Sequence, residues 1–197
     1  MRAMHLTETS LVNPAFLLAD AGVPMIFVTF PLMIYALVPI VLLEACVGGR
    51  SLQLRFGRSA WVFSVANLVS TIIGFPAAWV VMIALEFGLG TTILPHVSDK
   101  VFATPVGKVL GFIMTSAWLG PSDTDLYWAV PLAALVLLVP SFFFSWYIEA
   151  FILDQMVEPD WPTVKSASLK ANLASYSLLF LCGSVWLLVS LLRYRPK

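Results

Sequence analysis

The sequence predicts an all-α integral membrane protein with four membrane-spanning helices, built from two tandem, parallel helical hairpins. Three observations support this fold class. Of the 197 residues, 60% are hydrophobic and only 11% are charged, whereas a soluble globular domain carries about 25% charged residues. Four apolar runs are long enough to cross a bilayer, and polar residues of the first half recur in register in the second half. With a mean hydropathy of +0.92, most of the chain is expected to lie in lipid.

The four predicted spans follow from the length of the apolar runs. A helix needs about 20 mostly apolar residues to cross the roughly 30 Å hydrocarbon layer of a bilayer. Such runs occupy residues 23–47, 60–85, 126–153 and 167–192. Each is therefore expected to form one transmembrane helix.

The segments outside the spans are expected to lie at the membrane surface. Residues 1–22 mix charged, polar and apolar side chains and lack the basic start and small-residue cleavage site of a signal peptide. We expect them to form an N-terminal surface segment.

The connection 95–125 contains one further apolar stretch, Val101–Leu119, which is about long enough to span. Its Pro, Gly and Lys residues favour an interfacial or re-entrant helix over a fifth span, with Lys108 extending toward the headgroups. If this stretch did cross the membrane, the two hairpins would be antiparallel, as in the inverted repeats of many transporters.

The two halves of the chain resemble each other at an offset of 105 residues. Glu44 aligns with Glu149, and the sequence Ala-Asn-Leu-Val-Ser at 66–70 aligns with Ala-Asn-Leu-Ala-Ser at 171–175. Apolar coincidences are common in membrane segments, but two Glu and two Asn in register among so few polar residues indicate a duplication. The predicted units are hairpin 1, residues 23–94, and hairpin 2, residues 126–197 with its basic tail.

Each hairpin is expected to contain one intramembrane polar pair. Because an α-helix rises about 1.5 Å per residue, Glu44 and Asn67 lie at similar depth below the same interface. The same holds for Glu149 and Asn172. An Asn amide that donates to the Glu carboxyl would satisfy two groups that are costly to leave unpaired in lipid. The alternative is functional: buried ionisable groups also bind cations or carry protons.

Small residues at four-residue spacing mark the second helix of each hairpin. Such ridges let neighbouring helices approach closely. We therefore predict a helix-packing seam formed by Ala66, Ser70 and Gly74 in hairpin 1 and by Ala167, Ala171 and Ser175 in hairpin 2.

Several function classes are excluded by missing residues. His5 and His96 are the two histidines and fall outside the predicted spans, so haem ligation between helices is not expected. Cys46 and Cys182 are predicted at different depths, which favours free thiols over a disulfide. The chain has no recognisable catalytic motif, and with a formal net charge of zero it has no basic block for nucleic acid. We expect no enzyme activity, cofactor or metal.

These observations predict a non-catalytic accessory or scaffold subunit of a larger membrane complex. Its partners would be the lipid bilayer and other membrane protein subunits, in a bacterial inner membrane or an equivalent energy-converting membrane. The alternative is a small homo-oligomeric transporter or channel that uses Glu44 and Glu149 for proton or cation coupling.

Overall fold

A computed structural model describes residues 22–92, 99–120 and 126–193. Within them, four helices are long and apolar enough to cross a membrane, as the sequence predicted. They are α2 (Met25–Ser51), a rod composed of α3 (Phe56–Val69), the π-helical turn η1 (Ser70–Gly74) and α4 (Phe75–Thr92), then α7 (Leu126–Asp154) and α8 (Trp161–Arg193). The predicted surface segment, apart from Gly22, and the basic tail after Arg193 lie outside the described residues.

The helices extend beyond the predicted apolar runs, and the turns within the hairpins are short. Only residues 52–55 separate α2 from α3, and 155–160 separate α7 from α8. α8 begins at Trp161 instead of near residue 167 because Lys165 can remain helical while its long side chain reaches polar surroundings. Pro162 lies in the first turn of α8, where a missing N–H removes no helical hydrogen bond.

The described part of the segment between the hairpins, residues 99–120, contains two helices that are too short to cross a membrane. It contains α5 (Asp99–Ala103) and α6 (Pro105–Met114), which has 10 residues, about half the length of a span. α6 is capped by Thr104, whose side chain accepts a hydrogen bond from the N–H of Gly107 at 3.0 Å. The described part of this connection therefore contains no fifth spanning helix.

The described residues are mainly helical, as predicted, and one short β pairing is added to the helices. β1 (Val23–Pro24) pairs antiparallel with β2 (Trp118–Leu119). Next to this pairing, the carbonyl of Ala117 accepts hydrogen bonds from the N–H of Met25 and from the indole of Trp79, both at 3.0 Å. These contacts attach the connection between the hairpins to the start of α2, a tertiary interaction that local sequence patterns do not indicate.

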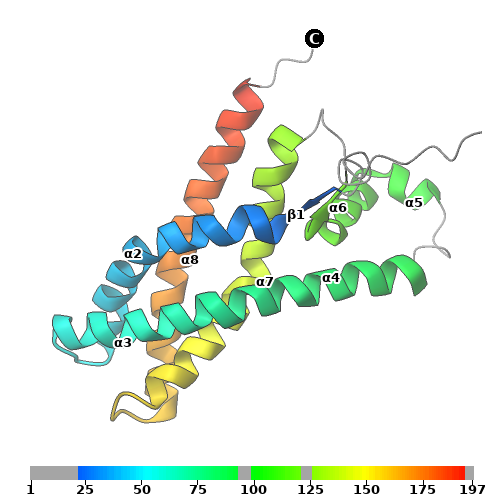
Figure 1. The fold of residues 1–197 in the computed structure, drawn as a ribbon. Helices are drawn as coiled ribbons and strands as arrows, with labels where there is room; N and C mark the ends of the chain where they lie inside the picture. Colours follow the sequence, from blue (N-terminus) through cyan, green and yellow to red (C-terminus); the bar gives the residue numbers. More distant parts are fainter. Residues whose placement is uncertain (1–21, 93–98, 121–125, 194–197) are drawn as a thin grey trace, which may run out of the picture.

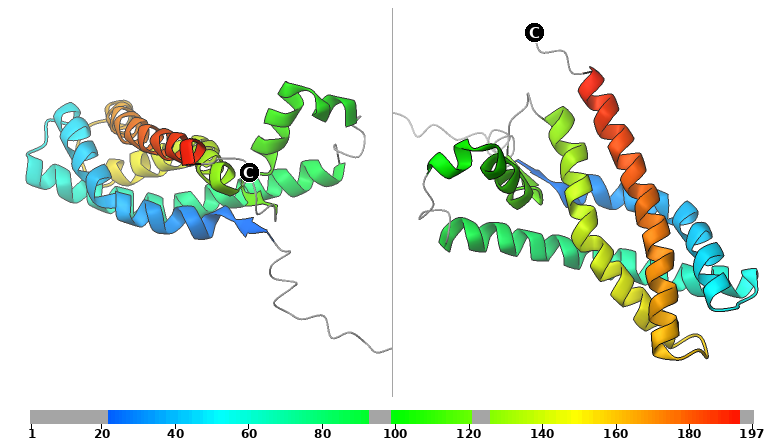
Figure 2. Two further views of the ribbon diagram at one scale, coloured as in Figure 1. Left: turned by 90° about the horizontal axis from the view of Figure 1, so that it is seen from above. Right: turned by 180° about the vertical axis from the view of Figure 1, so that it is seen from behind.

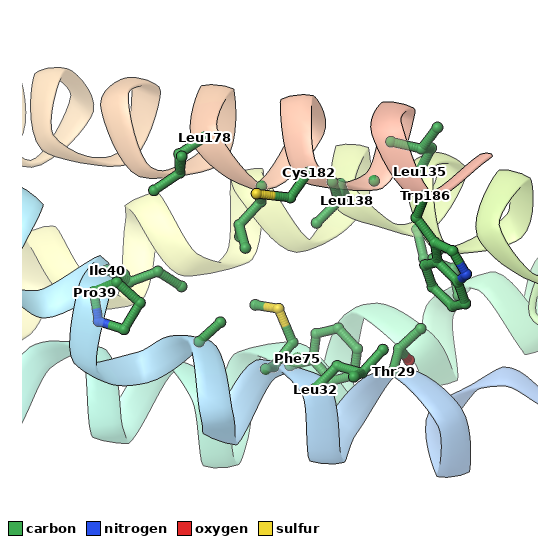
Figure 3. A pocket seen from close by; sticks show the side chains of 16 residues that line it. Thr29, Leu32, Pro39, Ile40, Phe75, Leu135, Leu138, Leu178, Cys182 and Trp186 are labelled. Carbon is green, nitrogen blue, oxygen red and sulfur yellow. The ribbon is translucent and has the colours of Figure 1, made fainter. Parts of the chain in front are cut away.

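The two hairpins cross each other obliquely. In Figure 1, the paired helices α7 and α8 run across α2 and the rod formed by α3, η1 and α4. The two views in Figure 2 show the same pairing of α7 with α8, and α5 and α6 at the far end of α4. α2 contains Pro31 and Pro39, each of which removes a backbone hydrogen bond, and the helix bends near Pro39 (Figure 3).

A tight contact between α2 and α3 holds the first hairpin together. A Cβ atom placed on Gly48 would lie 2.1 Å from Cζ of Phe63, whose side chain is fully buried. Nothing lies within 4 Å of the corresponding point at Gly57, in the first turn of α3. Gly48 is therefore required for the close approach of the two helices, whereas Gly57 is not.

This contact predicts that Gly48→Ala destabilises the protein. The added methyl group must displace a buried aromatic ring, and such overpacking costs about 1–3 kcal/mol in the free energy of unfolding. Gly57→Ala is the matched control and is expected to be neutral or to stabilise by up to about 1 kcal/mol. Both are measured by denaturant unfolding in detergent, followed by circular dichroism. Equal stability of the two variants would contradict the close approach of α2 and α3.

Candidate functional site

A buried cluster of polar side chains lies where the four long helices meet. Glu44 of α2, Glu149 of α7 and Asn172 of α8 are 0% exposed, and Asn67 of α3 is 3% exposed. Together with three buried serines they form what we call the polar cluster: Glu44, Asn67, Ser70, Ser145, Glu149, Asn172 and Ser175.

Each hairpin contributes one carboxyl and amide pair with the same geometry. Nδ2 of Asn67 donates to Oε2 of Glu44 at 2.6 Å, and Nδ2 of Asn172 donates to Oε2 of Glu149 at 2.6 Å. In both pairs the partners are 23 residues apart. Each amide also donates to a backbone carbonyl one turn earlier in its own helix, that of Phe63 at 3.0 Å or of Ser168 at 3.1 Å. These second bonds hold the amides toward the carboxyls.

Two serines connect the hairpins to each other. Oγ of Ser70, at the start of η1, donates to Oε1 of Glu149 at 2.8 Å. Oγ of Ser175 donates to Oε1 of Glu44. Each glutamate is therefore bound by the asparagine of its own hairpin and by a serine of the other. The sequence predicted these serines as small residues of a packing seam, with a polar cleft as the alternative for the face that carries Ser70. In the structure both hydroxyls are hydrogen-bond donors.

A third serine, Ser145, was not predicted from the sequence. Its Oγ lies 2.8 Å from Oε1 of Glu149 and 3.1 Å from Oγ of Ser70. The signal was present in the sequence, because Ser145 precedes Glu149 by four residues and so lies on the same helix face. The aligned position in the first half is Ile40, so the two halves of the cluster differ here.

The π-helical turn η1 lies beside the cluster. The N–H of Phe75 bonds to the carbonyl of Ser70, five residues earlier, which widens the helix locally. At Gly74, a Cβ atom would lie 2.9 Å from Cδ1 of Ile148 on α7. α8 is a regular α-helix at the aligned positions. The rod is thus adapted to contact α7 at the point where Ser70 reaches Glu149.

The remaining residues of the predicted seam are buried in helix contacts. Ala66, Ala167 and Ala171 are at most 1% exposed and belong to one hydrophobic cluster that also contains Leu153 and Val164. This hydrophobic cluster contains residues of both hairpins. Small side chains therefore surround the polar cluster on α3 and α8.

The chemistry available to the polar cluster is limited to hydrogen bonding and to its two carboxyls. Glu44 and Glu149 are linked through Asn172, which donates to Glu149, and Ser175, which bonds to both the Asn172 carbonyl and Glu44. Oδ1 of Asn172 is buried and has no hydrogen-bond partner among the described residues. In the described ranges, no group of three or more His, Cys, Asp or Glu side chains is placed to hold a metal ion. Cys46 and Cys182 are free thiols.

Comparison with known proteins finds no match, neither to a protein-family model nor to a curated protein nor to a solved structure. The interpretation of the polar cluster therefore depends on its own geometry.

The contacts of Ser70 predict that Ser70→Ala weakens the association of the hairpins. Removal of a hydroxyl that donates to a buried carboxyl is expected to lower the free energy of unfolding by about 1–3 kcal/mol. Ser64→Ala is the matched control in α3, since its hydroxyl bonds only to the carbonyl of Ala60 in the same helix, at 2.6 Å. Its effect should stay within about 0.5 kcal/mol. Denaturant unfolding in detergent measures both, and equal losses would show that the bond to Glu149 contributes nothing.

Proposed function

We propose that this chain is a non-catalytic integral membrane protein, an accessory or scaffold subunit of a larger membrane complex, in which the polar cluster holds two hairpins together. The observation that carries this proposal is the complete use of both carboxyls. Oε1 and Oε2 of Glu44 and of Glu149 each accept a hydrogen bond from the protein itself. Carboxyls bonded in this way suit a structural role, because a catalytic or transporting group must also contact its substrate.

We propose further that the hairpins arose by tandem duplication and are parallel. The helix that carries the asparagine begins eleven residues before it in both halves, at Phe56 before Asn67 and at Trp161 before Asn172. The exchanged bonds to Ser70 and Ser175 follow the same offset of 105 residues. A pseudo-twofold axis along the membrane normal would relate two such units.

The connection between the hairpins is proposed to lie at or within one interface of the membrane. α6 carries Val106, Val109, Leu110 and Ile113 as exposed apolar side chains, although it is too short to span. A short helix of this kind is suited to an interfacial or re-entrant position. We place the whole protein in a bacterial inner membrane or an equivalent energy-converting membrane.

The partners proposed for this subunit are lipids and the helices of other membrane proteins. Exposed large apolar side chains occur along all four long helices, for example Tyr35 at 82%, Trp61 at 65% and Leu192 at 73%. Surfaces of this kind are suited to lipid tails and to neighbouring helices alike. Such apolar surfaces allow the subunit to associate with lipids or with other helices without a polar binding site.

The subunit proposal is tested by extraction of the full chain from its native membrane in mild detergent. Native mass measurement and identification of co-purifying chains should give a stoichiometric complex with larger subunits. A clean monomer or a homo-oligomer would contradict the proposal.

The structural role of the polar cluster is tested by Asn67→Leu and Asn172→Leu. Each removes the donor to a buried carboxyl and is expected to lower the free energy of unfolding by about 1–3 kcal/mol. Ser177→Leu on α8 serves as control, because Ser177 is exposed. Unfolding in detergent measures all three. Asparagine variants as stable as the wild type would overturn the structural account.

The second candidate is a small homo-oligomeric transporter or channel. Two observations favour it: the carboxyls of Glu44 and Glu149 belong to one hydrogen-bonded cluster, and Oδ1 of Asn172 has no partner among the described residues. Paired carboxyls can share a proton or hold a cation. Glu44→Gln and Glu149→Gln should then abolish proton or cation flux in proteoliposomes while folding stays intact. Unchanged flux would eliminate this candidate.

A further inference from the structure

A second feature of the molecule is an apolar pocket between the hairpins, which we call the interhairpin pocket. It has a volume of about 290 Å³ and is lined by residues of α2, α4, α7 and α8, among them Met33, Ala36, Leu138, Cys182 and Trp186 (Figure 3). The hydroxyl of Thr29, also in the lining, donates to the carbonyl of Met25 at 2.6 Å in its own helix. Because this hydroxyl is already bonded, the lining favours hydrocarbon over polar ligands.

The pocket runs from the polar cluster toward the membrane face at which α8 ends. Its inner end is lined by Ile40, one turn before Glu44 on α2, and by Leu179, one turn after Ser175 on α8. Thr29 and Trp186 lie at the opposite end (Figure 3). With a rise of about 1.5 Å per residue, the lined stretch of α8 is on the order of 12 Å long.

The size and chemistry of the pocket fit part of one acyl chain. An apolar cavity of about 150 Å³ accommodates one benzene molecule, and the interhairpin pocket has a volume of about 290 Å³. A second helix, with a diameter of about 10 Å, is too wide to enter such a space. A flexible hydrocarbon chain can enter, and it buries apolar surface without the need for a hydrogen-bond partner.

A basic side chain lies beyond the outer end of the pocket, on the same face of α8. Leu179, Trp186 and Arg193 follow one another at seven-residue intervals, which places them on one stripe of the helix. Arg193 is exposed in the last turn of α8, about 10 Å beyond Trp186. A guanidinium at that position suits the phosphate of a lipid whose chain points back along the stripe.

We propose that the interhairpin pocket binds one acyl chain of an anionic phospholipid and that Arg193 binds its phosphate. The apolar lining of the pocket selects an acyl chain, and the positive charge of Arg193 selects an anionic headgroup. Because the lining belongs to both hairpins, the bound lipid contacts both of them between the polar cluster and the membrane face.

The proposal is tested by native mass spectrometry of the full chain with phosphatidylglycerol or phosphatidylcholine of identical acyl chains. The wild type should retain one phosphatidylglycerol in preference to phosphatidylcholine. Arg193→Gln should reduce that preference about fivefold. Arg50→Gln, at the end of α2 that lies away from Thr29, should not.

Ala36→Phe should abolish retention of both lipids, because its ring fills the pocket. Ala84→Phe, on an exposed position of α4, is the matched control.

A second measurement does not depend on the fold of the Ala36 variant. Phosphatidylglycerol brominated on its acyl chain, added in stoichiometric amount to the protein in detergent, should quench the fluorescence of Trp186. The contribution of Trp186 is the part of the quenching that is lost in the Trp186→Phe variant. Retention of the phosphatidylglycerol preference by Arg193→Gln, or equal quenching of the wild type and Trp186→Phe, would overturn the proposal.

Discussion

Two fully buried carboxyls impose the condition on which the rest of this fold depends. Glu44 and Glu149 lie between helices that are apolar enough to cross a membrane, where each unsatisfied polar group costs several kcal/mol. In each hairpin the asparagine supplies a donor to one carboxyl oxygen of its own glutamate. Ser145 supplies the second donor to Glu149 from the same hairpin, but the aligned residue Ile40 cannot do this for Glu44. The second donor to Glu44 comes from Ser175 of the other hairpin, and Ser70 adds a further donor to Glu149 across the same boundary. The hairpins must therefore cross at the level of the glutamates.

Close approach at this crossing explains the small residues around it. Ala45 and Ala150, which directly follow the two glutamates, are at most 2% exposed, and Ala66 and Ala171 are fully buried. Larger side chains at these positions would separate the hydroxyls from the carboxyls across the hairpin boundary. The π-helical turn η1 belongs to the same adaptation, because it begins at the residue that donates to Glu149.

Away from the crossing, the same oblique arrangement leaves space. Helices that meet at one level and diverge from it cannot fill the gap between them with short side chains, and the interhairpin pocket lies directly beside the polar cluster. A close polar contact and an open apolar space are thus two results of one geometry. The proposed subunit role and the proposed lipid site are compatible, since both require stable helices with apolar surfaces and no reactive group at the crossing.

The sequence by itself determined the number of helices that are long and apolar enough to cross a membrane, and the pairing within each hairpin. Apolar run length sets the first, and helical rise sets the depth at which Glu44 meets Asn67 and Glu149 meets Asn172. Local patterns did not indicate the β pairing, the short turns, η1 or the interhairpin pocket. Nor did they show that Ser70 and Ser175 exchange bonds between the hairpins. A serine serves equally well as a small packing residue and as a donor, and periodicity describes only the faces of one helix at a time. Which face meets which carboxyl depends on the rotation and crossing of whole hairpins, and only the tertiary structure decides that.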